Sequence, residues 1–262
     1  MKTSPEVVLV TGASSGIGWE LAKCFAADKS NLVLVARNRD ALEKLSAELQ
    51  AAHGIKVHIL SADLSRPETP QRIFQELSAQ NITVDVLINN AGFGLHGEFL
   101  DLPLSGQLDI IHVNITALTE LTGLFLPGMI QRRRGGILNV GSVAGFLPGP
   151  NMAVYYASKA FVLSFTEALA EETSGTGLKV SVLCPGPTES NFGNVARGGK
   201  SRQVERPKMS AQTVAQIGHQ EFRAGKVVVV PGISNKLLAF LPRVSPRKLA
   251  RRVVKKYNRT KK

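Results

Sequence analysis

Seven short apolar runs, rich in β-branched residues, are separated by longer segments in which apolar residues recur at helical spacing. The runs are residues 7–11, 32–36, 57–60, 84–89, 136–142, 180–184 and 227–230. Between the first two, Ile17, Leu21 and Phe25 recur every four residues, which is the period of one helix face. Regular alternation of strand and helix indicates parallel strands joined by right-handed crossovers. The sequence therefore predicts an α/β fold.

The predicted strands read as continuous hydrophobic stretches, not as alternating ones. This pattern is typical of a sheet that helices cover on both faces. We therefore expect a doubly wound parallel sheet of about seven strands, in which Asn38 caps the second helix. Ligands bind such sheets at the carboxyl ends of the strands, near the point where the strand order reverses.

The basic charge is concentrated at one end of the sequence. The chain has 262 residues and a net charge of +12, but residues 243–262 alone hold ten Lys and Arg and no acidic residue. The other 242 residues carry 22 basic and 20 acidic side chains. We expect one domain, residues 1–242, followed by a basic amphipathic tail, residues 243–262.

Leu249, Val253 and Tyr257 recur every four residues in this tail, with basic residues mostly elsewhere around the predicted helix. We favour packing of this apolar stripe on the body or on a partner subunit. The alternative is peripheral contact with an anionic membrane surface. Nucleic-acid binding is disfavoured, because no base-reading element accompanies the charge.

Several other classes of protein do not fit the sequence. No apolar run approaches the roughly 18 residues of a membrane span, and a strand-like run from Glu6 leaves no room for a secretion signal. Cys24 and Cys184 are isolated, and the histidines show no metal-ligand spacing. Ser142 lacks the glycine two residues before it that a hydrolase nucleophile elbow has. We expect a cytoplasmic protein without a metal, peripheral to a membrane if the tail binds one.

A glycine-rich segment, TGASSGIG at 11–18, joins the first strand to the first helix. Glycines permit close approach to a pyrophosphate, and the helix N-terminus supplies unpaired N–H groups. The alternative is a glycine-rich turn without a ligand. The predicted dinucleotide contacts in this segment are Gly12, Ser14, Ser15, Gly16, Ile17 and Gly18.

Three further strand ends carry candidate cofactor residues. Arg37, beside Asn38, stands where an acidic residue would bind the ribose of NAD, so NADP(H) is favoured through paired hydrogen bonds to the 2′-phosphate. The alternative is a solvated arginine. The other candidates are Asp63 and Leu64 after the third strand and Asn90, Ala91 and Gly92 after the fourth.

Tyr155 and Lys159 are four residues apart and share one face of a predicted helix, close to Ser142 at the end of the fifth strand. A cation about 5 Å away lowers a tyrosine pKa by roughly two units at an effective dielectric near 20. We therefore expect Tyr155 to exchange protons near neutral pH. Tyr156 has only Ala160 at the matching position, so Tyr155 is the predicted acid–base group.

These motifs together resemble the short-chain dehydrogenase/reductase family in its single-domain, NADP(H)-dependent form, which has the Rossmann fold. The resemblance runs from about residue 6 to residue 230 and includes NNAG at 89–92 and YxxxK at 155–159. It implies hydride transfer between a nicotinamide and a small carbonyl or alcohol substrate, as in a carbonyl reductase or an alcohol dehydrogenase. The implied catalytic residues are Asn114, Ser142, Tyr155 and Lys159, and both Tyr155 and Lys159 also contact the cofactor, as do Pro185, Gly186 and Thr188.

The resemblance also implies a homodimer or homotetramer, assembled through helices near residues 105–133 and 155–174. Segments 186–212, 95–104 and 145–154 are the predicted lining of the substrate pocket. An alternative function is that of a non-catalytic dinucleotide-binding sensor or scaffold, whose tail binds a partner or a membrane. The intact Ser142, Tyr155 and Lys159 argue against this alternative.

Overall fold

A computed structural model describes residues 5–189 and 208–258 of the chain. Its main feature is a seven-stranded parallel sheet with the strand order β3-β2-β1-β4-β5-β6-β9. The strands are β1 (Val7–Thr11), β2 (Asn31–Ala36), β3 (Val57–Ser61), β4 (Val86–Asn89), β5 (Gly136–Val140), β6 (Lys179–Leu183) and β9 (Val228–Val229). The predicted doubly wound fold is confirmed, and the strand order reverses between β1 and β4.

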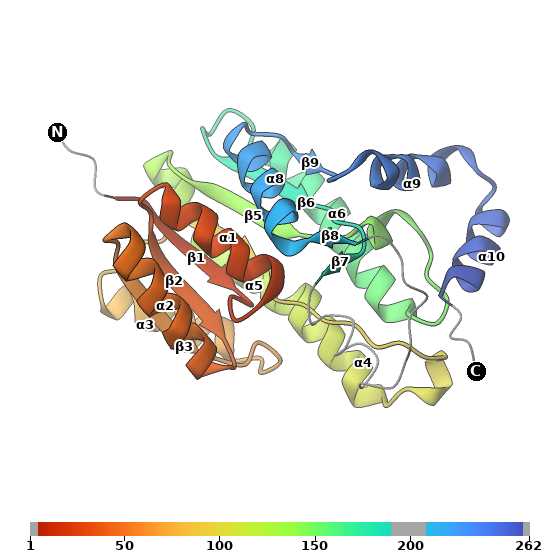
Figure 1. Ribbon diagram of the computed structural model, residues 1–262, viewed down its shortest axis with the longest axis horizontal. Coiled ribbons are helices and arrows are strands. Elements are labelled where there is room, and N and C mark those ends of the chain that lie inside the picture. The colour runs from red at the N-terminus through yellow and green to blue at the C-terminus, as the bar shows by residue number, and fades with distance from the viewer. Residues whose placement is uncertain (1–4, 190–207, 259–262) are drawn as a thin grey trace.

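Helices cover both faces of the sheet (Figure 1). Alternate residues of each strand point to opposite faces, so that Val8 and Leu9 belong to two separate hydrophobic clusters. One face packs against α1 (Gly16–Ala27), α2 (Arg39–His53) and α8 (Ala211–Arg223), and the other against α3 (Thr69–Ala79), α5 (Ala117–Arg132) and α6 (Ala153–Glu172). As predicted, Asn38 caps α2, because its side-chain oxygen accepts a hydrogen bond from the Ala41 N–H.

Some element boundaries differ from the sequence predictions. The fifth strand ends at Val140, and Ser142 instead caps the short 3-10 helix η3 (Val143–Phe146), where its hydroxyl accepts a hydrogen bond from the Ala144 N–H. A two-stranded pair, β7 (Thr188–Glu189) with β8 (Met209–Ser210), was not predicted. Two residues per strand are too few for sequence periodicity to reveal.

A long helical segment leads away from the crossover after β4. It consists of α4 (Leu104–Ile111), the π-helical turn η2 (His112–Thr116) and α5, and it follows the 3-10 helix η1 (Phe99–Asp101). By length and composition alone, residues 104–132 could cross a membrane. Yet Leu121, Phe125 and Met129 are buried in the core against the sheet. We therefore assign this segment as a core helix of the α/β fold.

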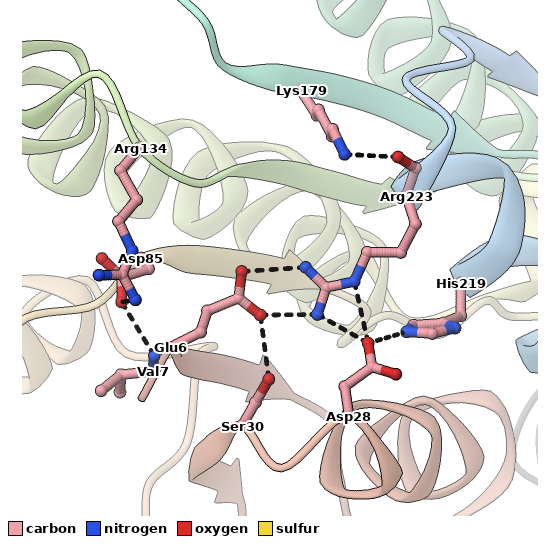
Figure 2. Close-up of polar contacts among 9 residues, drawn as sticks. All are labelled: Glu6, Val7, Asp28, Ser30, Asp85, Arg134, Lys179, His219 and Arg223. Atoms are coloured by element: carbon pink, nitrogen blue, oxygen red, sulfur yellow. Dashed lines mark hydrogen bonds and ion pairs between the residues drawn. The ribbon is translucent and has the colours of Figure 1, made fainter. Parts of the chain in front are cut away.

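Ion pairs and hydrogen bonds connect the elements at the end of the sheet where the strands begin (Figure 2). Arg223, at the end of α8, donates two hydrogen bonds to the Glu6 carboxylate, at 2.9 and 2.6 Å, and one to Asp28 at 3.0 Å. His219 contacts the same oxygen of Asp28 at 2.8 Å, and the hydroxyl of Ser30 donates to Glu6. This network ties α1 and α8 to the start of β1, at the opposite edge from the predicted site.

Two helices follow the last strand and lie at the side of the molecule far from β2 and β3 (Figure 1). They are α9 (Ile233–Val244) and α10 (Arg247–Tyr257). The predicted boundary after residue 242 therefore falls inside α9. Leu249, Val253 and Tyr257 are exposed on this chain, so the tail does not pack its stripe on the body, while packing of the stripe on a partner subunit stays a prediction. α10 docks instead through Val254 and the following Asn258.

Candidate active site

The switch point between β1 and β4 is held together by hydrogen bonds. The hydroxyl of Thr11 accepts hydrogen bonds from the N–H groups of Asn90 and Ala91, both at 3.0 Å. The side-chain amide of Asn90 donates to the carbonyl oxygens of Thr11 and Gly12, at 2.9 and 3.1 Å. The amide nitrogen of Asn90, a predicted cofactor residue, is thus used within the protein, where it shapes the glycine loop.

The glycine loop has the geometry that a dinucleotide needs. Gly12 and Gly16 have φ angles of +64° and +59°, which favour glycine. A Cβ atom on Gly18 would lie 2.5 Å from the carbonyl oxygen of Gly12, so that position leaves no room for a side chain. No described side chain caps the N-terminus of α1, which leaves its first N–H groups available for a pyrophosphate. The loop therefore fits the dinucleotide that the sequence predicts.

The end of β2 presents a free cation close to an acid. Arg39 is paired with Glu43 at 2.8 Å, whereas Arg37 is exposed and forms no ion pair within the part of the chain that the structure describes. Asp63, at the end of β3, accepts a hydrogen bond from the Ser65 N–H. Partial burial raises the pKa of Asp63, but this bond and the charge of Arg37 outweigh it, so the pKa lies below its ordinary value. Arg37 and Asp63 thus lie together at this edge, as predicted.

Tyr155, Lys159 and Ser142 are brought together as the sequence predicts. All three side chains are buried, and Ser142 lies close enough to Tyr155 for its side chain to favour a lower pKa of the tyrosine. The Nζ of Lys159 lies 6.0 Å from the centroid of the Tyr155 ring and donates a 2.7 Å hydrogen bond to the Val140 carbonyl. β5 and η3 thus supply the serine, and the first turns of α6 supply the other two groups.

The predicted electrostatics of this pair are wrong for this structure. Burial raises the pKa of Tyr155 to about 12, against the opposing effect of the Ser142 side chain. Burial also lowers the pKa of Lys159 to about 8. The spacing of four residues gives proximity, but the lysine is turned toward Val140 and both groups are removed from water, so desolvation dominates.

Asn114 lies in the π-helical turn η2 and is almost completely buried. Its amide donates to the Phe93 carbonyl at 3.0 Å and to the Ser158 hydroxyl at 2.9 Å, and its oxygen accepts from the Phe93 N–H. Asn114 therefore joins the loop after β4 to the helix that carries Tyr155. Such π-helical turns occur frequently at functional sites.

The residues after β6 approach the site from the other side. The Pro185 carbonyl accepts hydrogen bonds from the Val143 N–H at 3.0 Å and from the Ser142 hydroxyl at 3.4 Å. Thr188 donates its hydroxyl hydrogen to the Gly186 carbonyl. Residues 190–207, which belong to the predicted pocket-lining loop 186–212, lie outside the described residues.

A cavity of about 250 Å³ opens beside Tyr155. Its lining comes from two of the predicted segments, 95–104 and 145–154, and includes the apolar Leu95, Phe99 and Met152. The sequence did not predict the contributions of Ile110 from α4 and Lys255 from α10. The predicted basic tail therefore forms part of the wall of this cavity.

Two positions near Tyr155 were missed. A Cβ on Gly94 would lie 2.9 Å from the Tyr155 ring, so only glycine allows this approach. Tyr156 donates its hydroxyl hydrogen to the side-chain oxygen of Asn258 at 3.3 Å, and Asn258 donates to the Pro150 carbonyl at 2.9 Å. Nothing in the local pattern around Asn258 indicates these distant partners. The glycine after the NNAG motif was a visible signal for Gly94.

Fold and site together place this chain among the proteins with a dinucleotide-binding α/β fold. More narrowly, residues 6–200 match the short chain dehydrogenase family, and the chain belongs to that family. Ketoacyl reductase HetN of Nostoc sp. is 37% identical over 183 residues, which are 69% of this chain and 63% of that protein. Sulfoacetaldehyde reductase 2 of Chromohalobacter salexigens is 37% identical over 196 residues, or 74% and 77% of the two chains.

The match to a very-long-chain 3-oxoacyl-CoA reductase of Laccaria bicolor, at 37% identity, covers 67% of this chain and 52% of that protein. The chain thus spans between half and two thirds of the length of HetN and of this fungal relative. Among solved structures, a short-chain dehydrogenase from Sphingobium yanoikuyae in complex with NADPH has a TM-score of 0.80 and 34% identity, covering 87% of this chain and 88% of that one. A dehydrogenase from Burkholderia phymatum in complex with NAD has a TM-score of 0.82 and 25% identity, covering 96% and 97%.

Proposed function

We propose that this protein is an NADPH-dependent reductase of apolar ketones or aldehydes, with Tyr155 as the acid–base group. The observation that carries the proposal is the placement of the buried Tyr155 beside Ser142 at the wall of a largely apolar cavity, with Lys159 6.0 Å from the centroid of the tyrosine ring. A bound nicotinamide would supply the hydride. The chain itself must orient the carbonyl and deliver a proton to its oxygen.

The roles of the residues follow from their placement. Ser142 and Tyr155 can both bind a carbonyl oxygen, since each has a hydroxyl hydrogen to donate and the two side chains lie close to one another. The Tyr155 hydroxyl, protonated at neutral pH, donates the proton to the oxygen as negative charge develops there. Lys159 is held in place by its hydrogen bond to the Val140 carbonyl. Asn114 joins the Phe93 carbonyl to the Ser158 hydroxyl and so connects the loop after β4 to α6.

The preference for NADP(H) over NAD(H) is supported by Arg37. This exposed guanidinium, unlike that of Arg39, has no carboxylate partner among the described residues. A guanidinium can form paired, charge-assisted hydrogen bonds to a phosphate. The solved neighbours include complexes with NADPH and with NAD. The preference of this chain for one cofactor is therefore argued from its own residues.

The substrate class follows from the cavity. Leu95, Phe99, Leu102 and Ile110 make its lining largely apolar. Glu98 and Lys255 add one charge of each sign. Relatives named ketoacyl and 3-oxoacyl-CoA reductases, together with a neighbour titled a bulky-bulky ketone specific alcohol dehydrogenase from Comamonas testosteroni (TM-score 0.79, 28% identity, covering 92% of each chain), support a ketone substrate.

We also propose assembly into a homodimer or homotetramer through segments 105–133 and 155–174. Leu108 and Phe161 are exposed apolar side chains on these segments. Light scattering at micromolar concentration tests the assembly, and a monomeric mass would contradict it.

The first experiment is titration of the purified protein with NADPH and NADH, followed by NADPH oxidation assays with ketones, aldehydes and acyl carbonyls. Tighter binding of NADPH together with turnover of an apolar ketone is the expected result. NADPH binding without turnover of any carbonyl would instead support a dinucleotide-binding sensor or scaffold. Absence of dinucleotide binding would contradict the proposed function altogether.

A further inference from the structure

Helix α9 has two opposite faces. Its inner face buries Asn235 and Ala239, and Asn235 donates a 2.7 Å hydrogen bond to the Pro231 carbonyl. Its outer face is apolar and exposed, with exposed fractions from 46% to 86%. This face consists of Ile233, Leu237, Phe240, Leu241 and Val244. The spacing of four, seven, eight and eleven residues from Ile233 places all five on one side of the helix.

Helix α10 continues this pattern and adds charge. Leu249, Val253 and Tyr257 are exposed and share one side of the helix. The other half of the helix surface holds six exposed basic side chains. They are Arg247, Lys248, Arg251, Arg252, Lys255 and Lys256. We call the outer apolar face of α9 together with the exposed residues of α10 the α9–α10 surface.

The chemistry of the α9–α10 surface restricts what can cover it. Eight large apolar side chains exposed on two adjoining helices exceed the single exposed residues that are normal on a monomer. Residues 227–262 contain no Asp or Glu, so a second copy would bring basic groups against basic groups. A surface that offers both negative charge and an apolar layer complements both features. An anionic bilayer has these two properties.

We infer that the α9–α10 surface is a membrane-docking site for bilayers that contain anionic phospholipids. The apolar side chains enter the boundary between headgroups and acyl chains, and the basic side chains of α10 contact the headgroups. α10 is also attached to the proposed active site, because Val254 packs with Tyr155 and Tyr156 and Lys255 lines the cavity. Docking therefore places the cavity close to the lipid interface, where apolar ketones accumulate.

The full chain can be tested by flotation with vesicles of phosphatidylcholine alone and of phosphatidylcholine mixed with phosphatidylserine. We expect binding only to the mixed vesicles, and weaker binding at high salt because the charges are screened. Each basic side chain near an anionic surface contributes a factor of roughly five in affinity. The double variant Arg251→Glu, Arg252→Glu should therefore bind at least roughly tenfold more weakly.

Matched variants separate the contribution of charge to vesicle binding from the contribution of apolar contact. Lys44→Glu with Arg72→Glu makes the same change in net charge on exposed sites of α2 and α3, and should bind vesicles nearly as the unchanged protein does. Leu237→Ser with Phe240→Ser keeps the net charge and should also weaken binding markedly. Thermal unfolding monitored by circular dichroism tests whether each variant is folded, and it does not depend on enzymatic activity.

Three outcomes would overturn the inference. One is failure of the folded, unchanged protein to bind the phosphatidylserine vesicles. Another is equal loss of binding in the α10 variant and in its charge-matched control. The third is conversion of an oligomer to a monomer by the Leu237→Ser, Phe240→Ser variant in light scattering, which would assign the surface to a second copy of this chain.

Discussion

Tyr156 donates its hydroxyl hydrogen to the side-chain oxygen of Asn258, and this bond joins the helix that carries Tyr155 to α10. The backbone carbonyl of Asn258 also accepts a 2.7 Å hydrogen bond from the His96 ring. Two adjacent tyrosines thus have different surroundings. Tyr155 faces Ser142 and the cavity, while Tyr156 holds the C-terminal helix in place.

The variants Tyr155→Phe and Tyr156→Phe form a matched pair, since each loses one hydroxyl. Loss of a general acid lowers the rate about 10²- to 10⁴-fold, so Tyr155→Phe should lower kcat by this factor while NADPH binding, measured by fluorescence, stays nearly unchanged. Tyr156→Phe should retain most of the turnover. Full activity in Tyr155→Phe would remove the basis for the proposed chemistry.

The variant Asn258→Ala removes the side-chain bonds to Tyr156 and Pro150. We expect faster amide hydrogen exchange in α10 and a higher KM for the carbonyl substrate, because Lys255 of α10 lines the cavity. The binding constant for NADPH should not change. Arg252→Ala, on the exposed side of the same helix, is the control, and an equal effect there would argue against a specific role of Asn258.

Arg37→Gln should raise the KM for NADPH roughly tenfold and leave the KM for NADH nearly unchanged. The reason is that a hydrogen bond to a charged group contributes about 1.5–3 kcal/mol, with the lower end applying at an exposed site. Arg39→Gln is the control, because Arg39 is already paired with Glu43. Equal changes for the two cofactors would show that Arg37 does not distinguish them.

Gly94→Ala should lower kcat about 10- to 100-fold, because a methyl group would displace the Tyr155 ring and small displacements of catalytic groups are costly. Gly123→Ala on α5 provides the comparison, since nothing lies within 4 Å of its added Cβ. That variant should keep its activity and gain up to about 1 kcal/mol in unfolding free energy. Normal kcat in Gly94→Ala would show that the ring can move without penalty.

The network at the start of β1 predicts a pH dependence of stability. Burial raises the pKa of Glu6, but the hydrogen bonds and charge of Arg223 more than compensate, so the pKa lies below its ordinary value of 4.5. The Glu6 carboxylate therefore stabilises the fold above pH 4.5, and this contribution is lost as the pH falls through the lowered pKa.

Glu6→Gln should accordingly lower the unfolding free energy at pH 7 by about 1.5–3 kcal/mol, and the difference from the unchanged protein should shrink in acid. Urea unfolding between pH 3 and pH 7 measures both quantities. Glu172→Gln, at the exposed end of α6, is the control. A difference that does not depend on pH would mean that Glu6 acts through packing and not through charge.

Local patterns were sufficient for the seven strands of the main sheet, for the glycine loop and for the proximity of Tyr155 and Lys159, because each depends on residues close together in the sequence. They were not sufficient for the pKa of Tyr155. Its rise to about 12 comes from burial, which the whole fold determines. The partners of Asn258 are more than a hundred residues away in the sequence, and no periodicity links them.

The exposure of the tail stripe was missed for a related reason. Amphipathic spacing identifies a helix and its apolar face, but it does not say what covers that face. Val254 and Leu249 are both apolar residues of α10, yet only Val254 is buried. Val254 lies on the side of α10 that packs against Tyr155 and Tyr156, and the following Asn258 is hydrogen-bonded to Tyr156 and Pro150.

The π-helical turn at His112–Thr116 has a consequence for how this chain tolerates change in length. A π-helical turn closes its hydrogen bond over one residue more than an α-helical turn. That turn holds the extra residue, so deleting one residue there would convert it to an α-helical turn and keep the faces of α4 and α5 in register. Asn114, which lies in the turn, would then lose the geometry that joins it to Phe93. Related sequences that lack this extra residue should therefore keep the same sheet and helix faces and differ in the link between the loop after β4 and α6.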